Sequence, residues 1–502
     1  MPIPVLDSSC QNLNLPSSAF LKTPLRSYVL LHASRKTFSN VKVSILAQWT
    51  PAPQNRSGPA LSPGQTWNEN QLFADETEAT LFLGALDTVF LFSYAVVVLT
   101  SSRLLVNPVC LSPCLCSGLY SSSSLEFLFG TLTEWLHFYN VYFYCALWVL
   151  NGLLQSAVWP CVVAVMGNWF GMSGRGFVFG LWSACASVGN ILGAFLASSV
   201  LCYGYEYAFL VTSSVQFAGG VIVFFGLLTS PKEIGEWRHK LSGLIPVGRN
   251  RLGSSPLRSP QRNRCCTSFP MASHRTLKTG RVSFDLSRAP DSSLLCLLPP
   301  LQYSLAYACL KLVNYSFFFW LPFYLSNNFG WEEAESDRLS IWYDVGGIVG
   351  GTVQGLISDF MGKRAPVLAV SLLLAMGSLV GYSRSPNDQV VNAVILAVTG
   401  FFIGGPSNMI SSAISADLGR QEALRGSQEA LATVTGIVDG TGSMGAAAGQ
   451  YLVSLIESRL GWMCVFYFFI VMTFGSVLFI SPLIVSEVRS MIRERRLRSH
   501  QL

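Results

Sequence analysis

Residues 303–325 read YSLAYACLKLVNYSFFFWLPFYL, an apolar stretch long enough to cross a bilayer, with one charge, Lys311, near its middle. A charged group at bilayer depth costs roughly 2.5–3.5 kcal/mol to insert, so it is retained where it faces a polar cavity or a partner. A second cationic site, Arg35 and Lys36, lies in the first hydrophobic region, SYVLLHASRKTFSNVKVSIL. Matching charges in two halves of the chain indicate one anion held between them.

The composition indicates an all-α membrane protein. Of 502 residues, 51% are hydrophobic and 12% charged, and the mean hydropathy is +0.43. The net charge of +6 comes mainly from one interior segment and the C-terminal tail, so it favours membrane orientation over a nucleic-acid partner. The 13 cysteines show no zinc-type spacing, and we expect neither a metal nor a cofactor. No nucleophile–base grouping or phosphate-binding glycine loop points to an enzyme.

The hydrophobic segments predict about twelve transmembrane helices in two six-helix bundles, a layout typical of two-fold-repeat transporters. The first helix is expected to be short, because Lys22, Pro24 and Arg26 precede it, and the third lies in an irregular stretch near residues 100–131. The predicted domains are an N-terminal segment (1–26), the first bundle (27–229), a disordered basic cytosolic linker (230–293), the second bundle (294–486) and a basic cytosolic tail (487–502).

Sidedness follows from charge and from one sequon. The polar segment after the first span contains a glycosylation sequon at Asn55, which places that segment in the lumen or outside the cell. The basic linker and tail are expected in the cytosol by the positive-inside rule, so both termini are cytosolic.

Small residues spaced by four mark the fifth helix of each half, where backbones can approach closely in lipid and where we expect the two halves to slide against each other. The pairs are Gly176 and Gly180, Gly189 and Gly193, and Gly445 and Gly449.

The segment GLISDFMGKR ends a glycine-rich helix with an acid, a turn glycine and two bases: Asp359, Gly362, Lys363 and Arg364. Such a loop can pair with neighbouring helix ends in different conformations. We interpret it as a gate or hinge, with topology-setting charge as the alternative.

Several stretches together resemble the major facilitator superfamily and, within it, the organophosphate:phosphate antiporters of the sugar phosphate exchanger type. They include LLHASRKTFSNVK from Leu30, RGFVFGLWSACASVGNILG from Arg175, LKLVNYSFFFWLPFYL from Leu310 and GLISDFMGKR from Gly355. The resemblance implies that Arg35, Lys36 and Lys311 bind the phosphoryl group, although Lys36 points about 100° from Arg35 on a helix and can face a neighbouring helix instead. It also implies that the loop ending at Arg364 is a gating loop and that the membrane is that of the endoplasmic reticulum or the lysosome.

The chemistry of these residues suits a phosphate monoester. Arginine offers a planar fork to two oxygens, whereas lysine is a compact point charge. Tyr307, Asn314 and Tyr315 flank Lys311 at helical spacing and can contact the rest of the substrate, or can form interhelical hydrogen bonds instead. Asp87, in another span, is interpreted as a packing or hydrogen-bonding group.

The predicted function is exchange of a phosphorylated organic anion for inorganic phosphate by alternating access, because an empty site with unneutralised cations should resist closing into a dry state. The expected partners are these anions and the lipid bilayer, and no nucleic acid. Two alternatives stay open. One is a carrier of another organic anion such as a phosphonate. The other is a non-transporting scaffold or partner-dependent subunit with an accessory membrane protein, since residues 100–124 lack the gating loop expected after helix 2.

Overall fold

Helices account for nearly all of the part of the chain that the computed structural model describes, residues 17–50, 72–101, 111–158, 161–162, 175–226, 291–414, 418 and 428–499. Within these ranges, twelve helices have 15 residues or more. This confirms the predicted all-α fold. The sequon at Asn55 lies outside the described residues, as does the predicted linker up to residue 290.

The first half of the chain contributes six of the long helices. These are α2 (Ser17–Asn40), α4 (Glu76–Ser101), α5 (Leu111–Glu126), α7 (Val141–Gln155), α9 (Arg175–Val200) and α10 (Tyr205–Gly226). Shorter elements lie between them: α3 (Lys42–Trp49), the π-helical turn η2 (Phe127–Leu132), α6 (Thr133–Trp135) and the 3-10 turn η3 (Leu201–Tyr203). The first helix begins at Ser17 and so contains the polar positions that the sequence analysis placed before it.

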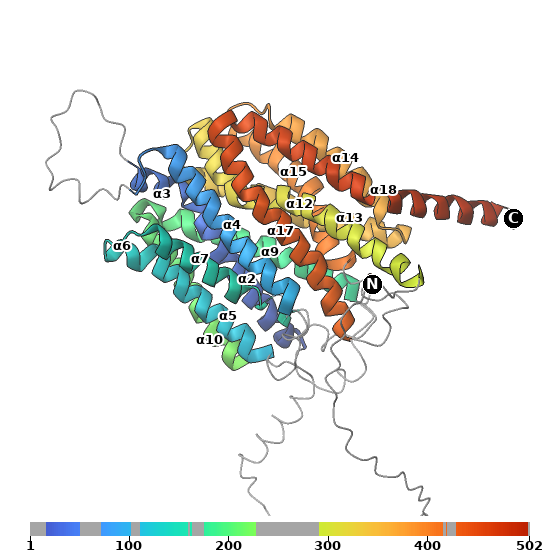
Figure 1. Cartoon of the computed structure of the whole chain (residues 1–502), viewed down its shortest axis with the longest axis horizontal. Coiled ribbons are helices and arrows are strands. Elements are labelled where there is room, and N and C mark those ends of the chain that lie inside the picture. Colours follow the sequence, from blue (N-terminus) through green and yellow to red (C-terminus); the bar gives the residue numbers. More distant parts are fainter. Residues whose placement is uncertain are drawn as a thin grey trace, which may run out of the picture.

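The second half contributes the other six long helices. These are α12 (Asp291–Phe329), α13 (Glu333–Met361), α14 (Ala365–Tyr382), α15 (Gln389–Met409), α17 (Gln428–Leu460) and α18 (Trp462–Ser499), with the π-helical turn η5 (Ile410–Ile414) after α15. The blue-to-green helices of the first half and the yellow-to-red helices of the second form two neighbouring groups, and the end of α18 projects beyond them (Figure 1).

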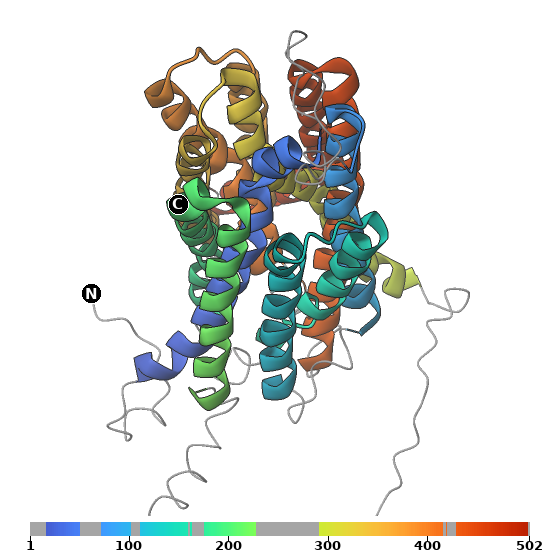
Figure 2. The same cartoon turned by 90° about the vertical axis from the view of Figure 1, so that its left-hand side faces the viewer.

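Seven described helices are both long and apolar enough to cross a bilayer: α4, α9, α10, α12, α14, α15 and α18. The long helices α2, α13 and α17 are not among them, because they carry more polar and glycine residues. Figure 2 shows why this matters for α2, which runs obliquely through the middle of the molecule. A helix inside the bundle can carry polar groups that a lipid-facing helix cannot.

The two halves repeat the same local structure at the start of their fourth long helices. Asn140 precedes α7 and its side chain accepts a hydrogen bond from the Phe143 N–H, while Asp388 precedes α15 and accepts one from the Val391 N–H. Each cap satisfies one of the backbone donors that a helix leaves unpaired at its N-terminus. The equivalent positions of the two caps support an internal repeat.

Helix packing follows the same two-fold scheme. Within the halves, α9 packs on α2 and α17 packs on α12. Between the halves, α4 packs on α17 and α9 packs on α13, so the second and fifth helices of each half hold the interface together. The first helices of the halves, α2 and α12, also contact each other.

The glycines of the fifth helices bring backbones together within each half. A Cβ added at Gly189 or Gly193 of α9 would collide with the backbone of α2. One added at Gly445 of α17 would collide with the backbone of α12, and one at Gly449 with the Leu312 side chain. The four glycines therefore face the first helix of their own half rather than the opposite half. Gly176 and Gly180 lie at the start of α9, where only the backbone is described.

We expect Gly193→Val and Gly445→Val to destabilise the protein by about 1–3 kcal/mol, because the added atoms would have to move a backbone carbonyl rather than a flexible side chain. Thermal unfolding in detergent measures the effect. Gly377→Val, on an exposed part of α14 with nothing within 4 Å of the added Cβ, is the matched control. An equal loss of stability in all three variants would contradict this interpretation.

Candidate functional site

A cavity of about 80 Å³ lies between the two halves, large enough for several water molecules. Its walls come from α2 and α9 of the first half and from α12, α13, α15 and α17 of the second. Four charged side chains line it, two lysines and two aspartates: Lys36, Lys311, Asp344 and Asp439. The cavity therefore brings opposite charges from separate helices into one polar space.

Lys311 is held on α12 by groups from α17. Its ammonium lies 2.7 Å from a carboxylate oxygen of Asp439 and donates to the Ser443 hydroxyl at 2.8 Å. The rings of Tyr307 and Tyr315 lie with their centroids 5.4 and 5.0 Å from the same ammonium, within cation–π range. With 3% of its side chain exposed, Lys311 is a buried cation whose charge is balanced by an acid. The expectation of an unneutralised cation does not hold at this position.

Lys36 has a different kind of partner, a backbone carbonyl of the opposite half. Its ammonium donates to the Phe318 carbonyl of α12 at 2.6 Å, and the Ser39 hydroxyl donates to the same oxygen at 2.7 Å. This carbonyl lies four residues before Pro322, which has no N–H to give it the usual intrahelical hydrogen bond. The proline thus leaves an acceptor inside the protein, and two donors of α2 satisfy it. No ion pair of Lys36 occurs among the described residues.

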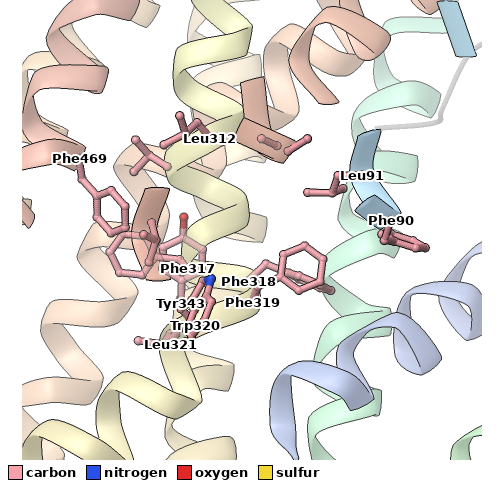
Figure 3. Close-up of a cluster of buried hydrophobic side chains, with 14 of the residues drawn as sticks. Phe90, Leu91, Leu312, Phe317, Phe318, Phe319, Trp320, Leu321, Tyr343 and Phe469 are labelled. Atoms are coloured by element: carbon pink, nitrogen blue, oxygen red, sulfur yellow. The ribbon is translucent and has the colours of Figure 1, made fainter. Parts of the chain in front are cut away.

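The aromatic run around this carbonyl contacts both halves. Phe317 stacks on Tyr343 of α13, with ring centroids 4.8 Å apart, and also packs against Phe469 of α18. Phe319 instead lines a small pocket of the first half together with Phe90 of α4. Figure 3 shows this division, with Phe469 on one side of α12 and Phe90 on the other. Successive rings of α12 therefore fix its position against each half in turn.

Arg35 lies outside the central cavity. Its guanidinium donates from Nε and Nη2 to the Gln155 side-chain oxygen of α7, at 3.0 and 2.8 Å. It also lies over the rings of Phe90 and Tyr94, 5.2 and 5.4 Å from their centroids. The pocket that it lines is a small neighbouring space within the first half, which also contains Glu126. Of the three predicted phosphoryl ligands, the structure brings together Lys36 and Lys311 but not Arg35.

The other predicted substrate contacts line the cavity beside Lys311. Tyr307, Asn314 and Tyr315 all face it. Asn314 also forms interhelical hydrogen bonds, accepting from the Tyr343 hydroxyl at 2.7 Å and donating to the Ser407 hydroxyl at 3.3 Å. Asn314 thus bonds to neighbouring helices and also faces the cavity. Its role in substrate binding stays a prediction.

Across the cavity, a polar chain joins the two halves. His32 Nδ1 lies 3.2 Å from the Asn190 side-chain oxygen, and the Asn190 amide donates to an Asp344 carboxylate oxygen at 2.7 Å. His32 and Asn190 belong to α2 and α9, while Asp344 belongs to α13. The carboxylate adds an acceptor that hydroxyl groups of a substrate could reach.

The predicted gating loop follows α13. Gly362 has a positive φ of 62°, the left-handed conformation that glycine adopts readily at a helix end. Arg364 pairs with Asp359 at 2.6 Å, and Lys363 lies 3.6 Å from Glu494 of α18. These contacts all lie within the second half. A gating function for the loop stays a prediction.

Sequence reasoning missed both acids of the cavity. Asp439 lies in GIVDGTGS and Asp344 in WYDVGG, each inside a segment recognised as a span. The signal that drew attention to Lys311, an ionisable group at membrane depth, applies equally to them. Asp87, by contrast, pairs with Lys42 at 2.5 Å, with both side chains fully buried away from the cavity. Two similar halves, with six long helices described in each and a charged, polar cavity between them, form the architecture of a membrane transporter.

Comparison with known proteins gives the family. The model described as Major Facilitator Superfamily matches residues 59–428. Sugar phosphate exchanger 3 of Gallus gallus is 66% identical over 481 residues, covering 94% of this chain and 93% of the relative. The Homo sapiens protein of that name is 63% identical, with 94% and 93% covered. A glucose-6-phosphate exchanger of Danio rerio is 34% identical, with 92% and 91% covered.

The fold is also that of a solved structure. A D-xylose–proton symporter matches with a TM-score of 0.56 over 92% of this chain and 95% of its own, at 11% identity, which shows the shared fold alone. The chain belongs to the major facilitator superfamily and, within it, to the sugar phosphate exchanger family, as its motifs predicted. It is therefore an integral membrane protein.

The contact between Lys36 and the Phe318 carbonyl can be tested by a mutant cycle. A Lys36→Ala, Ser39→Ala variant removes both donors and leaves the buried carbonyl unpaired, which costs about 1–3 kcal/mol in the free energy of unfolding. In a Pro322→Ala background the same pair should cost about 1 kcal/mol less, because alanine supplies the missing N–H. Chemical unfolding in detergent measures both. Equal costs in the two backgrounds would refute the role assigned to Pro322.

Proposed function

We propose that this protein exchanges a phosphorylated organic anion of the sugar phosphate type for inorganic phosphate by alternating access. The observation that carries the proposal is the placement of Lys36 and Lys311, from the first helix of each half, in one cavity. A phosphate carries a charge of about −1.5 to −2 and several acceptor oxygens, so it can bind both ammonium groups at once. The names of the relatives, a sugar phosphate exchanger and a glucose-6-phosphate exchanger, support this substrate class.

Binding of the anion competes with the present partners of both lysines. Phosphate on Lys36 displaces the Phe318 carbonyl of the opposite half, which weakens a contact between α2 and α12. Phosphate on Lys311 displaces Asp439, which stays within α12–α17 packing and can turn to Ser443 or to the Tyr94 hydroxyl, 3.4 Å away. An anion therefore loosens one inter-half contact that the empty protein keeps.

This competition makes movement depend on occupancy. Without an anion, Lys36 and Ser39 tie the halves together through one carbonyl, and Lys311 is neutralised by Asp439. With an anion, the direct contact between Lys36 and the Phe318 carbonyl is replaced by contacts of both lysines to the mobile anion, and the cations remain balanced, so the halves can rock around the site. The protein then changes between its two conformations only with an anion bound. It therefore exchanges one phosphate compound for another.

The proposal extends to membrane placement and partners. We place the protein in the endoplasmic reticulum or lysosomal membrane, as the resemblance to the sugar phosphate exchangers implies, and both termini in the cytosol, because the linker and tail are basic. Its ligands are a phosphorylated small anion and inorganic phosphate. The alternative is that the protein needs an accessory membrane subunit for its function.

Counterflow of labelled phosphate in proteoliposomes tests the proposal. Lys311→Ala should weaken phosphate binding about tenfold to a hundredfold, the effect of losing a hydrogen bond of about 1.5–3 kcal/mol to a charged group. Arg489→Ala, at an exposed position of α18, is the control and should transport normally. Rapid uptake into liposomes without internal anion would contradict exchange, and failure of the native chain would favour a non-transporting scaffold.

Asp439→Asn should have the opposite effect on affinity. The substitution keeps the size of the side chain but removes the charge that competes with an anion for Lys311, so half-maximal exchange should require less phosphate, by about tenfold. Phosphate dependence of counterflow measures this change. Unchanged or weaker apparent affinity would mean that Asp439 does not compete with the substrate.

A further inference from the structure

One buried carboxylate of α13 lies in the interface region between the halves and lacks a hydrogen-bond or ion-pair partner among the described residues. The side chain of Asp337 is 0% exposed, and neither of its carboxylate oxygens has a hydrogen-bond partner in the described structure. It also forms no ion pair with any described residue. Transfer of an ionised carboxylate into such a place is very costly, and the usual escape is to bind a proton.

The neighbouring turn shows that α13 closes on the opposite half here. Glu333, one turn before Asp337, accepts hydrogen bonds from the backbone N–H groups of Val43 and Ser44, at 2.9 and 3.1 Å, and from the Ser44 hydroxyl. These donors begin α3, whose N-terminus favours a negative charge. Glu333 thus accepts three hydrogen bonds that tie α13 to α3.

The groups around Asp337 leave ionisation uncompensated. Two charged side chains act on it, Glu333 on its own helix and Lys36 on α2. The nearby Glu333 carboxyl group disfavours a negative charge on Asp337. The ammonium of Lys36 donates to the Phe318 carbonyl and not to Asp337. Among the other helices packed on α13, α14 and α15 carry no charged residue, α9 carries one only at its first position, and the Lys311 charge of α12 is balanced by Asp439.

The position of Asp337 along α13 connects it with the closure of the two halves. Glu333, Asp337 and Asp344 recur at four- and seven-residue intervals and so share one face of the helix. Glu333 lies at the contact with α3, Asp344 faces the central cavity, and Asp337 lies between them. In the present structure, packing of this face of α13 keeps water away from Asp337. When the halves part on the side of α3, this face becomes accessible to water.

We propose that Asp337 is a proton-binding site, and that closure of α13 against α2 and α3 takes up one proton from water on that side. The proton adds to a carboxylate oxygen as water leaves, and it returns to water when the side opens. Acid on that side then favours the closed state, and alkali favours the open one. The proposal rests on the proposed function only for its effect on transport, since the proton site itself needs no substrate.

Infrared difference spectroscopy of the full chain in nanodiscs tests the proton site directly. The native protein near neutral pH should show the carbonyl stretching band of a buried carboxylic acid, and Asp337→Asn should lose it. Glu335→Gln, an exposed acid two positions earlier on the same helix, should keep it. Asp337→Ser gives a second assignment of the band if the asparagine variant does not fold. Absence of the band from the native protein, or its persistence in the Asp337 variants, would overturn the proposal.

Phosphate exchange in proteoliposomes then tests the consequence. Between about pH 5 and about pH 8, the native rate should change by up to about tenfold per pH unit over part of the range, following protonation of one group. Asp337→Asn stays neutral, so its rate should lose this dependence, while Glu335→Gln should retain it. Exchange with the same pH profile in native and Asp337→Asn protein would overturn the link to closure. Failure of all variants to exchange would instead refute the proposed function and leave the infrared result to decide on the proton site.

Discussion

The constraint on which the structure depends is that a cation inside a bundle of apolar helices must be solvated by the protein itself. Lys311, Lys36 and Lys42 meet it in three ways. Lys42 has a fully buried acid, which is a permanent structural pair. Lys311 has an acid at the edge of a cavity, and Lys36 has a carbonyl that exists as a free acceptor only because of a proline. The last two lysines lie at the central cavity, where we propose that an anion replaces their partners, whereas the first lies away from it.

Geometry therefore separates structural from functional charge better than burial does. All three lysines are almost wholly buried. The difference lies in where their partners are: Lys311 pairs within its own half but at the central cavity, whereas the other two lysines differ in which half they reach. Lys42 pairs across α3 and α4 within one half, whereas Lys36 reaches across to the other half. A contact between halves is broken and remade whenever the halves move, so a ligand that replaces it changes the cost of movement.

Much of the fold could be predicted from the sequence, because apolar stretches of membrane length and the Lys311 and Arg35-Lys36 sites are local features. The helices α2, α13 and α17 are not apolar enough by length and composition to count as membrane spans, although the sequence analysis recognised spans there, since helices that line a polar interior are less apolar than those that face lipid. The resemblance assigned phosphoryl binding to both Arg35 and Lys36, with a neighbouring helix as the alternative for Lys36. Adjacent helical residues point about 100° apart, and only the packing of α2 decides which one faces the cavity. The sequence contains Asp439 but does not show that it pairs with Lys311, because that contact between α12 and α17 depends on tertiary structure.

The central claim is that one anion bridges the first helices of the two halves through Lys36 and Lys311. The most direct test is an experimental structure of the full chain with saturating inorganic phosphate. The account predicts phosphate oxygens within hydrogen-bond distance of both ammonium groups, with the Lys311–Asp439 pair and the Lys36–Phe318 contact broken or lengthened. Phosphate bound elsewhere, with both contacts unchanged, would contradict it.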